Sequence, residues 1–143
     1  MSRSQQGFTL VELMITVAIL AIIAAVAVPS YSHFTRRAHL RDAQAALMEN
    51  AYFMEQFYAQ NNRFRNTDGT RPALTKTQTA HFNIAFSNGT VCSASPNDND
   101  HYCMIATSKN ANAEPRVLVL DEAGKMQLCQ SNVAADAADC AAY

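Results

Sequence analysis

The sequence lacks the short motifs that mark common active sites. It has no nucleophile elbow, no glycine-rich phosphate-binding loop and no H-E-x-x-H metal-binding motif. Its four histidines are scattered along the chain, with no base–nucleophile grouping nearby: His33, His39, His81 and His101. We therefore expect that the protein is not an enzyme and that it uses no cofactor and no metal.

Excess charge, tryptophan and internal repeats are missing as well. The 143 residues carry 11 basic and 12 acidic side chains, which gives a net charge of −1. A chain so nearly balanced has no global attraction for nucleic acids or anionic membranes. Without repeats or low-complexity segments, the composition indicates one globular domain with a hydrophobic segment added to it.

A long apolar run near the beginning of the chain is what the sequence does have. From Leu13 to Val28 only Thr16 is polar, and a helix over 8–28 would be roughly 30 Å long, about the thickness of a bilayer's hydrocarbon core. Three alanines near the end of this run, Ala24, Ala25 and Ala27, could imitate a signal-peptidase site, but Pro29 and the helical pattern beyond it argue against one. A plain membrane anchor explains this run, but it does not explain the carboxylate of Glu12.

The stretch "GFTLVELM", the apolar helix after it and the following "PSY" resemble the class III signal of type IV prepilins. The resemblance implies that a prepilin peptidase cleaves between Gly7 and Phe8 and that the new Phe8 amine is methylated. It divides the chain into a leader (1–7), a membrane-spanning and filament-core helix (8–35) and a globular pilin domain (36–143). In that family, the glutamate at the place of Glu12 pairs with the N-terminal amine of a neighbouring subunit. A buried carboxylate is costly unless it is paired, so we expect Glu12 to act in assembly.

Beyond Pro29 the pattern becomes amphipathic. Pro29 removes one helical hydrogen bond, so we expect it to kink the helix without ending it, and we count it among the assembly residues. Three arginines then mark the exit from the apolar region: Arg36, Arg37 and Arg41. Apolar residues recur at spacings of three and four: Leu40, Ala43, Leu47, Ala51, Met54 and Phe57. The pattern predicts a helix to about Gln60 with one face on a sheet, and polar residues such as Asn50 on its other faces.

Beyond residue 80 the hydrophobic period changes to two. "HFNIAF" alternates as a half-buried strand does, and "YCMIAT" and "RVLVL" are read as two more strands. "DEAG" is typical of a hairpin turn into a fourth strand, "KMQLC". The last stretch, 130–143, is expected to be a loop or a frayed helical turn. We predict an α+β fold in which a long N-terminal helix, first apolar and then amphipathic, packs on a four-stranded antiparallel sheet. This is the type IV pilin fold that the resemblance implies.

The four cysteines allow three pairings, which the sequence alone does not resolve. The local pairing of Cys92 with Cys103 and of Cys129 with Cys140 is favoured, because each pair brackets a polar loop beside a predicted strand. A domain delivered across the inner membrane matures in an oxidising compartment, where disulfides are the default. The alternative is a metal site of Cys92, His101 and Cys103, but this spacing fits no zinc ribbon or finger.

The stretch 45–74 is similar to minor pilins of the competence (ComP) and PilE/PilV type, whose competence members are DNA-uptake receptors. Four basic residues lie in the loop between the helix and the first strand, against only Asp68: Arg63, Arg65, Arg71 and Lys76. Such a positively charged patch attracts DNA phosphates. Lys109 and Arg116 would extend the patch if the strand edge that carries them lies beside this loop. The other interpretation of these charges is an ordinary solvated loop.

Two functions follow from the resemblance. The first is a minor pilin that contributes to extracellular DNA binding and uptake, with double-stranded DNA as a candidate partner. The second is a purely structural or priming pilin that acts in pilus assembly, adhesion or twitching motility. Both imply other pilin subunits, the prepilin peptidase and the inner-membrane assembly machinery as partners. Both also imply a single-pass inner-membrane precursor with a periplasmic globular domain, and an extracellular pilus after assembly.

Overall fold

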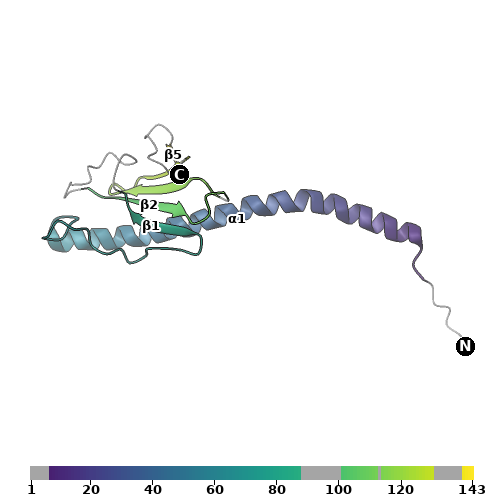
Figure 1. Ribbon diagram of the computed structural model, residues 1–143, viewed down its shortest axis with the longest axis horizontal. Helices are drawn as coiled ribbons and strands as arrows, with labels where there is room; N and C mark the ends of the chain where they lie inside the picture. Colours follow the sequence, from purple (N-terminus) through teal and green to yellow (C-terminus); the bar gives the residue numbers. More distant parts are fainter. Residues whose placement is uncertain (1–6, 88–100, 113, 131–139) are drawn as a thin grey trace, which may run out of the picture. The chain divides into compact units, whose positions relative to one another are not determined.

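Helix α1 runs from Leu10 to Asn61 without interruption, as Figure 1 shows. The computed structural model describes residues 7–87, 101–112, 114–130 and 140–143, except for the side chains at positions 29 and 30. The helix passes through position 29, so Pro29 does not end it; the predicted kink stays a prediction. It begins two residues after Phe8, because the hydroxyl of Thr9 accepts a hydrogen bond from the Glu12 amide at 3.3 Å and caps the first turn.

The chain divides into two compact units, Met1–Arg37 and Ala38–Tyr143. In the first unit, Phe8 before the helix and the apolar side chains of α1 are exposed, for example Phe8 at 86% and Ile22 at 69%. This part of α1 is long and apolar enough to cross a membrane, with a mean hydropathy of 2.7 in its most apolar window. The second unit, called the globular unit below, contains the rest of α1 and the sheet.

One face of α1 is buried in the globular unit, and it is the face that the spacing predicts. Five of the six predicted core residues are less than 10% exposed: Leu40, Ala43, Leu47, Ala51 and Met54. Phe57 is half-buried. At its start, this part of α1 also contacts the segment before the sheet, because the rings of His39 and His81 stack with their centroids 3.5 Å apart. Burial of this apolar face of α1 against the sheet is the main stabilising contribution to the folding of the unit.

The sheet is an antiparallel meander in which each strand pairs with the next along the chain. Its strands are β1 (Phe82–Phe86), β2 (Cys103–Ser108), β3 (Val117–Asp121), β4 (Met126–Cys129) and β5 (Cys140–Ala142). Apolar side chains on one face complete the core with α1, including Phe82, Ile84, Met104, Ala106, Leu118 and Leu120. The turn between β3 and β4 is the predicted one: Gly124 has a φ of 75°, and the Asp121 carboxylate accepts hydrogen bonds from the amides of Ala123 and Lys125.

The sheet has five strands, so the prediction of four strands and an irregular C-terminus is wrong in this respect. Cys140 lies directly opposite Cys129, and the next two residues continue the pairing. The disulfide between Cys129 and Cys140 ties the short strand to β4, as the local pairing predicted. Strand β5 has three residues, two of them alanine, which is too few to show an alternating pattern in the sequence. The disulfide stabilises its pairing with β4.

A second, smaller cluster lies on the other face of the sheet. It contains Cys103, Val117, Val119 and Cys129, with Ile105 and Cys140 packed against it. Since side chains alternate along β3, both of its faces are covered by apolar groups, and its first four residues are buried. β3 is therefore the centre of the globular unit.

Candidate functional site

The loop between α1 and β1 is anchored at its beginning by an aromatic stack. The chain leaves α1 through Asn62, which has a φ of 53°, and then buries Phe64. The ring of Phe64 packs against Tyr58 in a tilted arrangement, with centroids 4.6 Å apart, and edge-to-face against Tyr102, with centroids 4.8 Å apart. Burial and then the charge of Glu55 raise the pKa of Tyr102 to about 12, so this stack stays uncharged at physiological pH.

A tight turn follows Phe64 and brings two of the predicted arginines together. The Asn66 amide donates to the Thr70 carbonyl at 2.8 Å, and the Gly69 amide donates back to the Asn66 carbonyl at 3.0 Å. Arg65 and Arg71 are the residues on either side of this closed turn, so they are adjacent at its base. Arg65 also donates a hydrogen bond to the Gly69 carbonyl.

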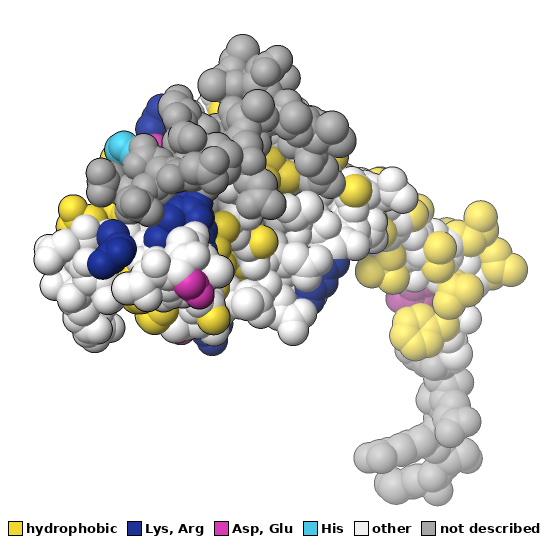
Figure 2. All heavy atoms as spheres, turned by 60° about the vertical axis from the view of Figure 1, so that its left-hand side comes forward, with side chains coloured by type: hydrophobic (Ala, Val, Ile, Leu, Met, Phe, Trp, Pro, Cys, Tyr) yellow, Lys and Arg dark blue, Asp and Glu magenta, His cyan; other side chains and the backbone are white. Residues whose placement is uncertain are grey.

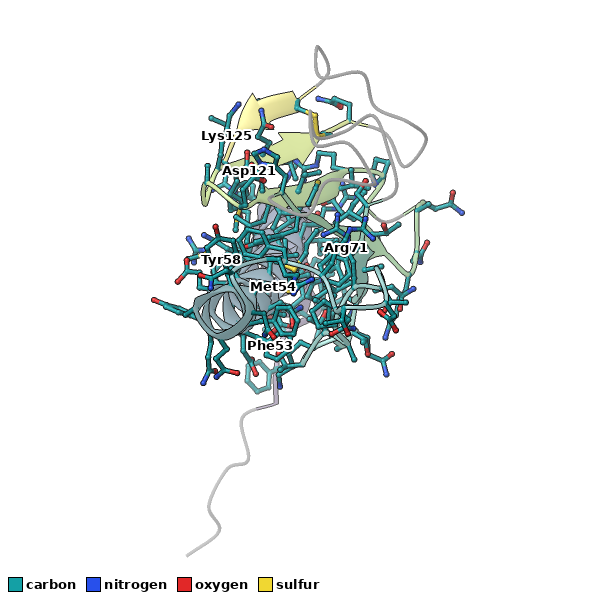
Figure 3. All side chains as sticks on the ribbon, turned by 90° about the vertical axis from the view of Figure 1, so that its left-hand side faces the viewer. Phe53, Met54, Tyr58, Arg71, Asp121 and Lys125 are labelled. Atoms are coloured by element: carbon teal, nitrogen blue, oxygen red, sulfur yellow. A yellow bond between two sulfur atoms is a disulfide. The ribbon has the colours of Figure 1, made fainter. Side chains whose placement is uncertain are left out.

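Arg71 is fixed by two further contacts. Its guanidinium lies over the ring of Phe86, 5.0 Å from the centroid, and donates to the His101 carbonyl at 3.2 Å. Figure 3 looks at the globular unit from the C-terminal end of α1 and shows Arg71 well apart from the β3–β4 turn, where Asp121 and Lys125 lie. Arg71 is therefore held at the beginning of β2 and the end of β1, on the same side as the loop.

Arg63 is the most exposed of the three loop arginines. Phe64 points inward, so its neighbours on both sides face outward, and Arg63 is exposed whereas Arg65 is half-buried. The nearest acidic side chain in the loop is Asp68, whose pKa is lowered by hydrogen bonds from the hydroxyl and the amide of Thr70. Asp68 is therefore ionised, and the loop has three arginines against one carboxylate. Figure 2 shows dark-blue side chains close together at this end of the globular unit, with one magenta side chain below them.

Lys76 does not lie with these arginines. Its backbone is bound to Asn50 of α1, and its ammonium lies 3.8 Å from the carboxylate of Glu49. Asn50 and the last residue of α1, Asn61, are 11 positions apart, or about 17 Å along the helix axis. The structure thus separates Lys76 from the predicted patch and leaves Arg63, Arg65 and Arg71 in it.

Asn50 anchors the far end of the loop, and the sequence-based expectation that it lies on a polar face is wrong. It is fully buried. Its amide nitrogen donates to the Lys76 carbonyl at 2.7 Å, and its amide oxygen accepts from the Thr75 hydroxyl and the Lys76 amide, both at 2.9 Å. The side chain therefore replaces backbone partners for an extended segment that lies on the helix.

Lys109 and Arg116, the two residues that could have extended the patch, are engaged elsewhere. Lys109 donates to the Gln78 side chain at 3.1 Å and to the Thr79 carbonyl at 2.7 Å. Arg116 forms a two-pronged ion pair with Glu114, at 2.6 and 2.8 Å. This hydrogen bonding raises the pKa of Arg116, and the pair cancels its charge.

The structure also excludes the alternative metal site. Cys103 is disulfide-bonded and cannot act as a thiolate ligand, and the His101 ring nitrogen is bound to the Glu122 carboxylate at 2.6 Å. Within the described part of the chain, no three potential ligands converge on a metal position. Cys92 lies outside the described residues, so its pairing with Cys103 stays a prediction.

The residues predicted for processing and assembly lie at the start of the first unit. Gly7 and Phe8 precede the helix, and both are exposed. Glu12 is in the first turn of α1, where a carboxylate is favoured by the helix dipole. A peptide bond outside the helix is the geometry that a peptidase needs at its cleavage site.

The chain matches known proteins along most of its length. Residues 29–130 match the family described as "Type IV minor pilin ComP, DNA uptake sequence receptor", and residues 2–28 match the prokaryotic N-terminal methylation motif. The chain is 36% identical over 104 residues to the type IV wide pilus major component PilA4 of Thermus thermophilus, covering 73% of this chain and 74% of that protein. It is 54% identical over 43 residues to the type IV major pilin PilE1 of Neisseria gonorrhoeae, covering 30% and 26%.

Two solved structures share the fold. The solution structure of the minor DNA-uptake pilin ComP from Neisseria subflava has 28% identity and a TM-score of 0.56, over 73% of this chain and 95% of that one. The crystal structure of the minor pilin PilV from Neisseria meningitidis has a TM-score of 0.51 at 24% identity, over 72% and 95%, and supports the fold alone.

Proposed function

This chain belongs to the type IV minor pilins of the ComP family, and we propose that it captures extracellular DNA for uptake while it is assembled in a pilus. As a member of this family it is a structural subunit of a filament rather than an enzyme, and it associates with other pilin subunits. The observation that carries the proposal is the arginine loop, Arg63, Arg65 and Arg71, on a chain that matches a family described as a DNA uptake sequence receptor.

The loop suits a phosphate backbone in its charge and its shape. Arginine is favoured at phosphates because its planar guanidinium presents five N–H donors. The aromatic stack fixes Arg63 and Arg65 on both sides of Phe64, so less conformational entropy is lost when they bind. Phosphate contacts supply affinity and register, and guanine edges in the major groove are a further target for arginine. We therefore propose double-stranded DNA as the ligand.

The assembly part of the proposal concerns Phe8 and Glu12. We propose that cleavage after Gly7 by a prepilin peptidase frees the Phe8 amine, which is then methylated. In the filament, the amine of one subunit pairs with the Glu12 carboxylate of its neighbour, since neither charge is stable alone in an apolar core. Before assembly, the precursor crosses the inner membrane once and holds its globular unit in the periplasm; afterwards it is part of the extracellular pilus.

Mass spectrometry of the mature subunit tests the processing step. We expect a chain that lacks residues 1–7 and carries one methyl group on Phe8. The matched control is the same chain from cells without prepilin peptidase, which should keep its leader. Cleavage near the alanines before Pro29, or an intact leader in cells with an active peptidase, would show that the N-terminus is an ordinary signal or anchor.

The arginine loop is tested by removing two charges. Arg63→Gln with Arg65→Gln is expected to weaken DNA binding about tenfold and to lower the slope of log affinity against log salt by about two units, because each phosphate contact contributes about 0.9. A gel shift of residues 36–143 at several salt concentrations measures both. Folding should change by no more than about 1.5 kcal/mol, because Arg63 is exposed and half-buried Arg65 loses one hydrogen bond, to the Gly69 carbonyl. Transformation should fall while pilus assembly continues.

The control for this experiment is Lys76→Gln with Lys109→Gln, which removes the same charge from positions away from Arg63, Arg65 and Arg71. It should leave the slope close to that of the parent. An unchanged slope in the arginine variant would rule out the loop as the contact. If the parent shows no salt-sensitive binding, the second function, a purely structural or priming pilin, is correct; the near-neutral charge and the likeness to a major pilus component favour that alternative.

A further inference from the structure

Two exposed arginines follow the apolar run of α1, Arg36 and Arg37. Neither forms an ion pair or a side-chain hydrogen bond with any residue that the structure describes. The sequence supplies no partner along the helix either, because no acidic residue occurs within four positions of either arginine, which is the reach of side-chain pairing on a helix surface. The two guanidinium groups are therefore available to an anion from outside the chain.

Polar and aromatic side chains surround this part of α1 on all sides. At about 100° per residue, Arg36 projects about 140° around the helix axis from Tyr31, Arg37 about 240° and Phe34 about 300°. Tyr31 and Phe34 are 71% and 70% exposed. A protein partner would cover one side of the helix, whereas a ring of such groups suits a medium that surrounds it. The interface of a lipid bilayer is such a medium.

The distances along the helix agree with the layers of a bilayer. The apolar run ends at Val28, and a bilayer has about 5–8 Å of headgroup region beyond each face of its hydrocarbon core. Tyr31 follows Val28 by about 4.5 Å along the axis, which is the depth at which aromatic belts lie. The Cα atoms of Arg36 and Arg37 are about 12–14 Å from Val28, but the side chains of a helix tilt toward its N-terminus. Long arginine side chains extend back to the interface in this way, which brings the guanidinium groups to the level of the lipid phosphates.

A role in orienting the chain in the membrane does not explain these arginines. Positive residues beside a membrane-spanning helix usually stay on the cytoplasmic side. In the precursor proposed above, Arg36 and Arg37 follow the helix on the periplasmic side, where charge of this sign opposes the usual bias. A favourable contact with anions on that side therefore accounts for them better than a topology signal does.

We propose that Arg36 and Arg37 bind phosphate groups of the lipid headgroups in the periplasmic leaflet of the inner membrane. The inference rests on the membrane-spanning precursor of the proposed function. Guanidinium and phosphate groups form charge-assisted hydrogen bonds, often two at a time. The contact holds the subunit at a fixed depth in the bilayer before assembly, and it is broken when the subunit leaves the membrane for the filament.

Solid-state NMR of the full-length chain, in vesicles of phosphatidylethanolamine and phosphatidylglycerol, tests this contact. Carbon-13 in the guanidinium groups loses signal through dipolar coupling when phosphorus-31 lies close to it. Arg36→Lys with Arg37→Lys keeps both charges and removes two of the eight labelled arginines, so the phosphorus-dependent loss should shrink by about a quarter of the parent's arginine signal. Arg63→Lys with Arg65→Lys is the control, because it removes two labels from the globular unit and should leave the loss as it is in the parent. An unchanged loss in the variant of Arg36 and Arg37 would overturn the proposal.

Thiol labelling in the same vesicles separates this contact from the proposed membrane insertion. With the parent as the blank, Leu20→Cys should not react with a water-soluble maleimide, whereas Ala38→Cys should react. If Leu20→Cys reacts as fast as Ala38→Cys, the helix does not cross the bilayer, and the proposed precursor fails together with this contact. If Leu20→Cys is protected and the lysine variant keeps the full phosphorus-dependent loss, only the lipid contact is wrong.

Discussion

Glu12→Val is expected to leave membrane insertion intact and to lower the amount of this subunit in sheared pili at least about tenfold. The substitution makes the apolar segment of α1 more hydrophobic, so insertion has no reason to fail. In the pairing proposed above, however, the Phe8 amine of a neighbour would then lie in the apolar core of the filament without its counter-charge. Breaking a buried ion pair by removing one partner costs about 3–5 kcal/mol, which is more than enough to lower incorporation tenfold.

The matched control is Thr16→Val, which removes the only polar side chain of the Leu13–Val28 run without removing a charge. Among the described residues, the Thr16 hydroxyl bonds only the Leu13 carbonyl of its own helix, at 2.8 Å, so its loss should not affect assembly. Immunoblots of membranes and sheared pili measure the two pools. Equal incorporation of Glu12→Val and the parent would mean that the carboxylate is only tolerated.

Asn50→Leu is expected to destabilise the globular unit by about 3 kcal/mol. The leucine fits a face that is otherwise apolar, but the Lys76 amide and carbonyl and the Thr75 hydroxyl lose their partner. A polar group left without a hydrogen bond costs about 1–3 kcal/mol, and water replaces part of the loss because Thr75 and Lys76 are exposed.

Urea unfolding of residues 36–143 measures this effect as a lower midpoint at an unchanged slope. Gln56→Leu serves as the control, because Gln56 is an exposed residue of the same helix and should change stability by less than about 0.5 kcal/mol. If Asn50→Leu is as stable as the control, water satisfies the segment 75–76 and Asn50 is not its anchor.

The helix and four of the strands could be predicted because their patterns repeat. Five apolar residues from Leu40 to Met54 recur at spacings of three and four and are buried, and the alternation in "HFNIAF" places Phe82 and Ile84 in the core. The same spacing could have identified Asn50, which comes three residues after Leu47 and four before Met54. Its position is on the core face, but its polar side chain suggested the outside.

The candidate site was less predictable, because its geometry depends on where an irregular loop goes. Arg63, Arg65, Arg71 and Lys76 are close in sequence, yet Asn50 holds Lys76 about 17 Å along α1 from the helix end. Arg116 has a local signal that was available, since Glu114 is two positions away and lies on the same side of an extended chain. Strand β5 had no such local signal in the sequence, because its pairing with β4 depends on the disulfide between Cys129 and Cys140.

The loop between α1 and β1 is fastened at three points: by Phe64 in the aromatic stack, by Arg71 on Phe86 and the His101 carbonyl, and by Thr75–Lys76 on Asn50. Between the first two points the chain forms its turn largely from its own hydrogen bonds, from Asn66 to Thr70. Doubling the length of such a loop costs only about 0.6 kcal/mol. Residues can therefore be inserted or exchanged within 66–70 at little cost to the packing of the helix on the sheet, which does not involve this turn.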